Sequence, residues 1–290
     1  MPTRTAHPTE PTDTVTAADD VCALSLARRM AALLDRDPAT LAAGAPLPRG
    51  WHTLLFNPPT PQAALREDGA AGLGARLPDL GLPRLMLGGR AVQFLGDIPI
   101  GSPVRRETRR LSVEEKSGRS GRFAVVRIEH RVFVDRAPDP VLVERQDYLL
   151  REAPSAGPDR AKASQLAAPV AAPAAADAPH AVRRLLPDET LLFRYSAITD
   201  NPHRIHYDLA YARDVEGYPA LVVNGSIPGL FLLELFRAAT GREPRAIDSR
   251  NVAPMYCGRP LQLHLRHEAD HWRLWAVDDT GRTTWDARAT

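Results

Sequence analysis

A long run of alanine, proline and small polar residues divides this chain into two parts. The run occupies residues 153–182 and contains the stretch APSAGPDRAKASQLAAPVAAPAAADAPH. Such a composition cannot supply a packed core and is typical of a semi-extended linker. The chain, at 290 residues, is also longer than most single domains. The sequence therefore predicts two domains, over residues 18–152 and 183–290.

The part before the linker begins with a polar lead-in and one helix. Residues 1–17 are rich in threonine and proline and have little apolar surface to bury, so they are expected to be disordered. An apolar periodicity near 3.6 predicts an amphipathic helix over about residues 20–36, capped by Asp19 or Asp20 and ended by Asp37-Pro38. Residues 46–87 are crowded with proline and glycine, which favours loops.

Strand patterns follow in both parts of the chain. In the first part, β-branched and aromatic residues alternate with polar ones over residues 90–95, 104–113, 123–135 and 141–152. In the second part, we expect a strand over 189–196, a buried apolar helix over 227–239, and short strands over 245–254, 261–268, 272–277 and 283–288. The sequence thus predicts an α+β fold in which each half folds an antiparallel sheet around a helix.

Composition narrows the classes of partner and compartment. The 37 basic and 35 acidic side chains leave a formal charge of only +2, which gives no general electrostatic attraction to nucleic acid or to an anionic membrane. Cys22 and Cys257 have no metal-binding or disulfide-framework spacing. No apolar run is long enough to span a bilayer, and the first residues lack the core of a signal peptide. We therefore expect a cytoplasmic protein.

The segment over residues 193–226, FRYSAITDNPHRIHYDLAYARDVEGYPALVVNGS, concentrates reactive side chains. It resembles the hydratase 2 signature of MaoC-like hot-dog enzymes, most closely the branch of hydroxyacyl-thioester dehydratase type 2 and mesaconyl-C4-CoA hydratases. The first half is similar to the FAS1-like dehydratase domain of that branch at residues 46–48, 51–52, 58–62, 88–90 and 115–121. The resemblance implies a double hot-dog fold with a degenerate first repeat and a catalytic second repeat.

The same resemblance implies an activity. It indicates reversible hydration or dehydration across the α,β double bond of a short acyl-CoA thioester, with mesaconyl-C4-CoA first and itaconyl-CoA or a 3-hydroxyacyl thioester next. It implies no cofactor and no metal, and it leaves a homodimer open.

Roles for individual residues follow from the resemblance. His206 matches the family's base, and Asn201 stands where the wider family has aspartate, so it would orient the water; Asp200, one residue earlier, is an alternative carboxylate. A backbone N–H at Gly225 or Ser226, at the start of the apolar helix, would bind the thioester oxygen. The predicted catalytic residues are His206, Asn201 and Gly225, and the predicted substrate-binding residues are His203, Arg204, Asp200 and Ser226.

Other interpretations stay open at this point. Asn201 and Asn224 replace an aspartate and a histidine found in relatives, which is compatible with a non-catalytic acyl-CoA-binding module; a thioesterase is a third possibility. His203, His206 and Asp208 form a weak metal-ligand pattern without a familiar third spacing. The arginine run at Arg105, Arg106, Arg109 and Arg110 is interpreted as a solvated charge run rather than a site for coenzyme A phosphates.

Overall fold

The computed structural model describes residues 15–57, 59–71, 77, 79–118, 121–152 and 179–290. Most of the predicted lead-in and linker, residues 1–14 and 153–178, lies outside this part of the chain. The ends of those two predicted segments are in strands, because β1 spans Thr16–Val21 and β6 spans Ala181–Leu185.

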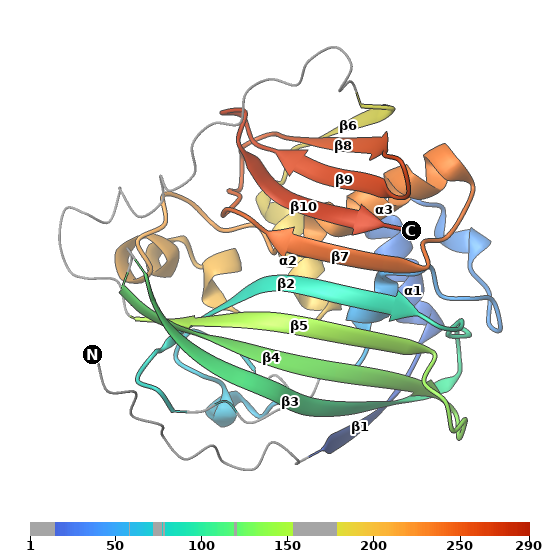
Figure 1. Ribbon diagram of the computed structural model, residues 1–290, viewed down its shortest axis with the longest axis horizontal. Coiled ribbons are helices and arrows are strands. Elements are labelled where there is room, and N and C mark those ends of the chain that lie inside the picture. The colour runs from blue at the N-terminus through green and yellow to red at the C-terminus, as the bar shows by residue number, and fades with distance from the viewer. Residues whose placement is uncertain (1–14, 58, 72–76, 78, 119–120, 153–178) are drawn as a thin grey trace.

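The described residues fold into one antiparallel sheet of ten strands with three helices on one side of it (Figure 1). The other strands of the first half are β2 Arg84–Phe94, β3 Pro103–Gly118, β4 Gly121–Val134 and β5 Leu142–Arg151. Those of the second half are β7 Ala246–Asn251, β8 Leu261–His267, β9 Trp272–Val277 and β10 Thr283–Ala289. The helices are α1 Leu24–Leu33, α2 Glu189–Ile198 and α3 Ile227–Thr240. This is the predicted α+β arrangement of two hot-dog repeats.

The two halves meet along β2 and β7. The strand order is β1-β3-β4-β5-β2-β7-β10-β9-β8-β6, and β2 pairs with β7 from Gly89 opposite Arg250 to Gln93 opposite Ala246. A Cβ atom on Gly89 would lie 2.6 Å from the Ser249 carbonyl oxygen, so this close approach requires glycine. The junction merges the two repeats into one continuous sheet with a shared apolar core.

Two predicted elements differ from the structure. The strand expected over residues 189–196 is wrong: this segment is α2, whose first turn is capped by the Asp188 carboxylate accepting from the Leu191 N–H at 2.7 Å. The helix expected from residue 20 begins at Leu24, because Asp19 and Asp20 belong to β1. Asp19 faces Arg105 across the β1–β3 pair, and opposite charges on neighbouring strands favour that pairing.

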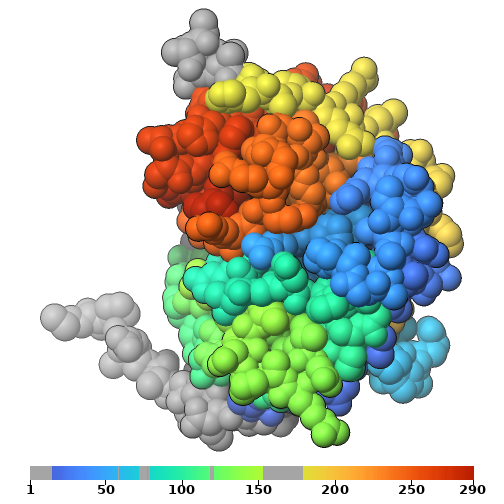
Figure 2. Space-filling model, turned by 90° about the vertical axis from the view of Figure 1, so that its right-hand side faces the viewer, coloured from blue at the N-terminus to red at the C-terminus, as the bar shows by residue number. Residues whose placement is uncertain are grey.

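Helix α3 is buried on nearly every side, as its apolar run predicts. Pro228 lies in its first turn, and Gly241, with φ +66°, ends it. Its one acidic residue, Glu234, accepts hydrogen bonds from Trp51 Nε1 at 3.1 Å and Arg237 Nη1 at 2.6 Å. Trp51 is fully buried and belongs to the first half, which lies against the second half in Figure 2. Glu234 therefore ties α3 to the first repeat.

We predict that Glu234→Ala lowers the free energy of unfolding by about 2–4 kcal/mol, because it removes the acceptor of the buried Trp51 indole N–H and one of the two carboxylates that pair with Arg237. Urea denaturation measures the change. Glu243→Ala is the matched control: Glu243 also pairs with Arg237, at 2.8 Å, but its side chain is 39% exposed against 10% for Glu234. We expect it to cost less than about 1 kcal/mol. Equal losses in the two variants would contradict the proposed tie.

Candidate active site

A cavity of about 1200 Å³ lies between the two halves. The first half contributes polar residues from β2 to β5, and the second half contributes the segment after α2 and the start of α3. Of the residues predicted for the site, Asp200, Asn201, His203, His206, Gly225 and Ser226 all line this cavity. The tertiary structure thus gathers most of the predicted residues, and it adds a group from the other repeat.

His206 is held as a neutral base. It lies in a helical turn over Arg204–His206, is only 6% exposed, and its Nδ1 lies 2.7 Å from the Val222 carbonyl oxygen. Because a carbonyl oxygen can only accept, Nδ1 carries the proton and Nε2 keeps its lone pair. Burial lowers the pKa of His206 to about 4, and the nearby His203 acts in the same direction. The imidazole is therefore uncharged and able to accept a proton at neutral pH.

Asn201 and Asp200 form the turn that follows α2. Asp200 has φ +45° and is exposed, and this left-handed residue reverses the chain so that the Asn201 N–H donates to the Ser196 carbonyl at 2.9 Å. The Asn201 Oδ1 accepts the His203 N–H at 3.3 Å. This bond fixes the plane of the Asn201 amide. The Nδ2 group of the same side chain then remains as the hydrogen-bond donor that Asn201 offers to the cavity.

The start of α3 presents one backbone donor to the cavity. The Ser226 N–H donates to Asn224 Oδ1 at 3.0 Å, and the Ile227 N–H donates to the Asn224 carbonyl at 3.0 Å. In the described part of the chain no acceptor is recorded for the Gly225 N–H. A Cβ atom on Gly225 would lie 2.7 Å from Asn251 Oδ1, so the tight packing here needs glycine. Of the two predicted donors, Gly225 is the one left for a ligand.

Arg204 and His203 contact a loop of the first half. Arg204 does not line the cavity: its guanidinium pairs with Asp208 at 2.8 Å and stacks over Tyr211 at 4.1 Å. Its backbone N–H donates to the Asp68 carbonyl at 2.8 Å. His203 lines the cavity with its ring edge toward His206, at 5.6 Å between centroids. These contacts give Arg204 a structural role and leave His203 next to the base.

The structure adds a buried polar cluster that the sequence interpretation missed. Glu144 accepts from Gln146 Nε2 at 2.9 Å and lies 3.2 Å from His52 Nε2 and 3.4 Å from Arg90 Nε. Burial alone would raise the pKa of the Glu144 carboxyl, but Arg90 and His52 hold it below its usual range. The signal in the sequence was polar residues at alternate positions of β4 and β5 that face inward, among them His130, Glu144 and Gln146.

The arginine run of β3 is split between the two faces of the sheet. Arg105 pairs with Glu107 at 2.5 Å and Arg109 with Glu129 at 3.1 Å, as expected for a solvated charge run. Arg106 instead lines the cavity, stacked over Phe56 with 5.1 Å between its guanidinium carbon and the ring centroid. The interpretation of the whole run as solvated is therefore wrong for Arg106, because successive strand residues point to opposite faces.

Within the described residues, no group of three His, Cys, Asp or Glu side chains could hold a metal ion. His203, His206 and Asp208 are not brought together as a group of three, because Asp208 pairs with Arg204.

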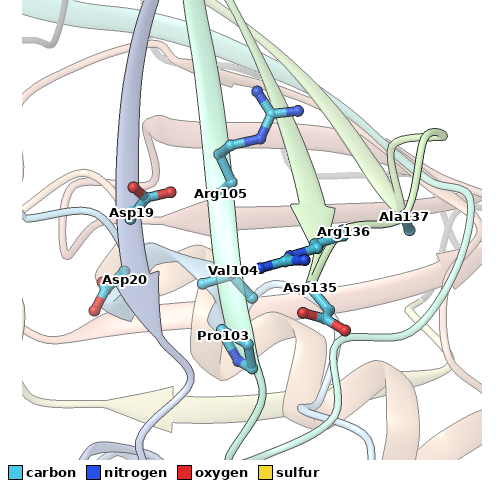
Figure 3. A pocket seen from close by; sticks show the side chains of 8 residues that line it. All are labelled: Asp19, Asp20, Pro103, Val104, Arg105, Asp135, Arg136 and Ala137. Carbon is cyan, nitrogen blue, oxygen red and sulfur yellow. The ribbon is translucent and has the colours of Figure 1, made fainter.

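A smaller hollow of about 440 Å³ lies at the edge of the sheet, lined by Asp19, Asp20, Arg105, Asp135 and Arg136 (Figure 3). None of the residues predicted for the active site lines this hollow. None of the described helices combines the length and apolar character needed to cross a bilayer.

Comparison with known proteins agrees with this geometry. The model of the hydroxyacyl-thioester dehydratase type 2 family matches residues 50–257. Mesaconyl-C(4)-CoA hydratase of Chloroflexus aurantiacus is 37% identical over 273 residues, which cover 93% of this chain and 92% of the relative. The chain belongs to the hydroxyacyl-thioester dehydratase type 2 family. It is therefore a hydro-lyase of the MaoC-like hot-dog type.

More distant proteins are similar over part of the sequence or in fold. The mitochondrial hydroxyacyl-thioester dehydratase type 2 of Schizosaccharomyces pombe is 30% identical over 89 residues, 30% of each chain. The crystal structure of HtdX from Mycobacterium tuberculosis has a TM-score of 0.64 at 15% identity and covers 95% of this chain and 99% of its own. A M. tuberculosis protein described as having a double hotdog fold has a TM-score of 0.60 at 15% identity. The match covers 97% of this chain and 96% of that protein. These structures support the double hot-dog fold.

We predict that His206 titrates near pH 4 rather than near 6.5, because burial penalises its charged form. Its folded pKa is depressed, so the folded protein takes up this proton only well below the pH at which the unfolded chain does. Stability is therefore lost as the pH falls from about 6.5 toward 4. NMR titration of the imidazole Cε1–H resonance, assigned with a His206→Ala variant, measures the pKa of His206 in the folded protein. A midpoint above pH 6 would contradict the buried neutral base.

Proposed function

We propose that this enzyme hydrates the double bond of mesaconyl-C4-CoA, reversibly, to the corresponding hydroxyacyl-CoA. The observation that carries the proposal is the neutral, Val222-locked His206 in the same cavity as the unoccupied Gly225 N–H. The acyl group is suggested by the Chloroflexus relative, whose 37% identity extends over nearly the whole of both chains. Coenzyme A as the carrier is part of the same proposal.

His206 acts as the general base. Its Nε2 takes one proton from water while the water oxygen bonds to the β-carbon of the acyl group. The π electrons move to the thioester, whose carbonyl oxygen gains enolate charge. The proton on Nε2 then passes to the α-carbon, so that H and OH have been added across the double bond and His206 is neutral again. Dehydration is the reverse sequence. The low basicity expected of the buried imidazole helps it return the proton.

Gly225 and Asn201 place the reacting groups. The Gly225 N–H, at the N-terminal end of α3, donates to the developing enolate oxygen, where the helix dipole also favours negative charge. The amide of Asn201, oriented by its bond to the His203 N–H, hydrogen-bonds the attacking water. Asp200 lies beside it on the cavity and is a substitute for the family's aspartate only if its exposed carboxylate turns inward. His203 and Ser226 are the nearest substrate contacts.

We predict that His206→Ala lowers kcat/KM for mesaconyl-C4-CoA hydration by about 10²–10⁴-fold, as expected for loss of a general base. Asn201→Ala is expected to lose about 10–100-fold, the cost of one or two hydrogen bonds to water. Loss of the enoyl-thioester absorbance measures the rate. Tyr207→Phe is the control, because Tyr207 adjoins His206 but is 52% exposed and does not line the cavity; it should act as the unchanged protein does.

Three outcomes would overturn the proposal. Unaltered hydration by His206→Ala would exclude the mechanism. Tight acyl-CoA binding without turnover would support a binding module instead, and release of free thiol from saturated acyl-CoAs would support a thioesterase. The thiol assay and the hydration assay use the same protein sample, so the three functions are separated in one series.

A further inference from the structure

The end of the cavity formed by the first repeat is built for a charged group. Arg106 on β3, His130 on β4, and Glu144 and Gln146 on β5 all line it, together with His52. Their side chains alternate with outward-facing ones along each strand, so a whole inner patch of the sheet is polar. An aliphatic acyl chain placed here would cover these groups and offer them no hydrogen bonds, which is unfavourable. This end of the cavity therefore does not fit a fatty acyl chain.

Most of the polar patch is already satisfied by its own members. Gln146 Nε2 donates to Glu144 Oε1 at 2.9 Å, and the Gln146 Oε1 accepts from the Tyr148 hydroxyl at 2.7 Å. The His130 ring spans Thr108 Oγ1 at 2.9 Å and Gln146 Oε1 at 3.2 Å. Burial lowers the pKa of His130 to about 4, so this ring is neutral near pH 7. The network is thus preorganised, with Glu144 as its anion.

Among the described residues, Arg106 is the arginine of this patch without an ion pair, while His52 Nδ1 and Arg90 Nε also lack a hydrogen-bond partner. In the described part of the chain Arg106 has no carboxylate within salt-bridge distance and no recorded hydrogen bond, and its buried Nε has no acceptor. The nearby Asp20 is engaged elsewhere, because its two oxygens accept the Val21 N–H at 2.7 Å and the Phe56 N–H at 2.6 Å. Glu144, the buried anion of this patch, pairs with Arg90 at 3.4 Å. Since arginine stays protonated, Arg106 places on the cavity a positive charge that no carboxylate among the described residues contacts.

The other arginines on the cavity differ from Arg106 in this respect. Arg84 pairs with Glu216 at 2.8 Å and donates to the Tyr218 hydroxyl at 3.1 Å. Arg151 and Arg282 also line the cavity, and each has a partner within the protein. The cation without an ion pair therefore lies on the inner face of β3, next to β4 in the sheet.

We propose that Arg106 binds the free carboxylate of a dicarboxylic acyl group whose thioester lies at His206 and Gly225. This inference rests on the proposed function and deepens it, because it assigns the choice of acyl group to the first repeat. A planar guanidinium can hold a carboxylate by two parallel hydrogen bonds. A monocarboxylic acyl-CoA would leave the charge of Arg106 buried and unpaired, which gives discrimination against it.

A binding experiment tests the proposal without depending on turnover. Succinyl-CoA and butyryl-CoA are saturated and cannot be hydrated, and they differ by a terminal carboxylate in place of a methyl group. Calorimetry with the full-length protein should show succinyl-CoA binding at least about tenfold more tightly, as expected for one charge-assisted contact in a partly buried site. In Arg106→Gln this preference should fall to within about twofold, and Arg106→Lys should retain part of it.

Arg105→Gln is the matched control. Arg105 is the adjacent residue on β3, points to the other face and does not line the cavity, so its variant should keep the full succinyl-CoA preference. Equal affinity of the unchanged protein for the two thioesters, or a preference that survives in Arg106→Gln, overturns the inference. Circular dichroism and thermal melting verify that each variant is folded.

The outcome is separable from that of the proposed function. A preference for succinyl-CoA that depends on Arg106 supports the carboxylate site even if mesaconyl-C4-CoA is not hydrated. Hydration of mesaconyl-C4-CoA that is lost in His206→Ala but undiminished in Arg106→Gln supports the function and overturns the carboxylate site.

Discussion

The backbone pairing of β2 with β7 is the interaction on which the rest of the structure depends. It turns two five-stranded repeats into one sheet, and it does so at Gly89, where a side chain would collide with the facing carbonyl. Because of this junction, the inner face of the first repeat and the segment after α2 of the second repeat enclose a common cavity. The indole of Trp51 bonded to Glu234 strengthens the same arrangement from the helix side.

The cavity has two chemically distinct ends. At one end lie the neutral imidazole of His206, the amide of Asn201 and the backbone N–H of Gly225. These uncharged groups can hydrogen-bond to water and to the developing enolate oxygen. At the other end, Arg90 pairs with the Glu144 carboxylate, and Arg106 has no ion pair among the described residues. We propose that reaction and acyl recognition are divided in this way between the repeats. The first repeat then contributes to substrate choice through the polar inner face of its sheet.

Much of the fold and of the reacting end was predictable because the information is local in the chain. The strands of the first half and the tail have a period of two, and α3 is apolar at most positions and ends at Gly241. His206, Asn201 and Gly225 stand within one short segment and line one cavity, although their roles stay proposals. The error at α2 has a local cause as well: its aromatic and apolar residues suit a strand, and only the Asp188 cap selects the helix.

The sequence by itself determined the two-repeat α+β organisation, and it determined that one short segment belongs to the site. Both follow from hydrophobic periodicity, helix capping and residue order, which involve residues that are close together in the chain. Only the tertiary structure decided that Arg204 is neutralised by Asp208 and that Gly225 rather than Ser226 keeps a donor for a ligand. It also decided that Arg106 has no ion pair among the described residues. Ion pairing and side-chain burial depend on residues brought together from distant strands and from loops such as that around Asp68. The order of residues along the chain does not give the distances between them.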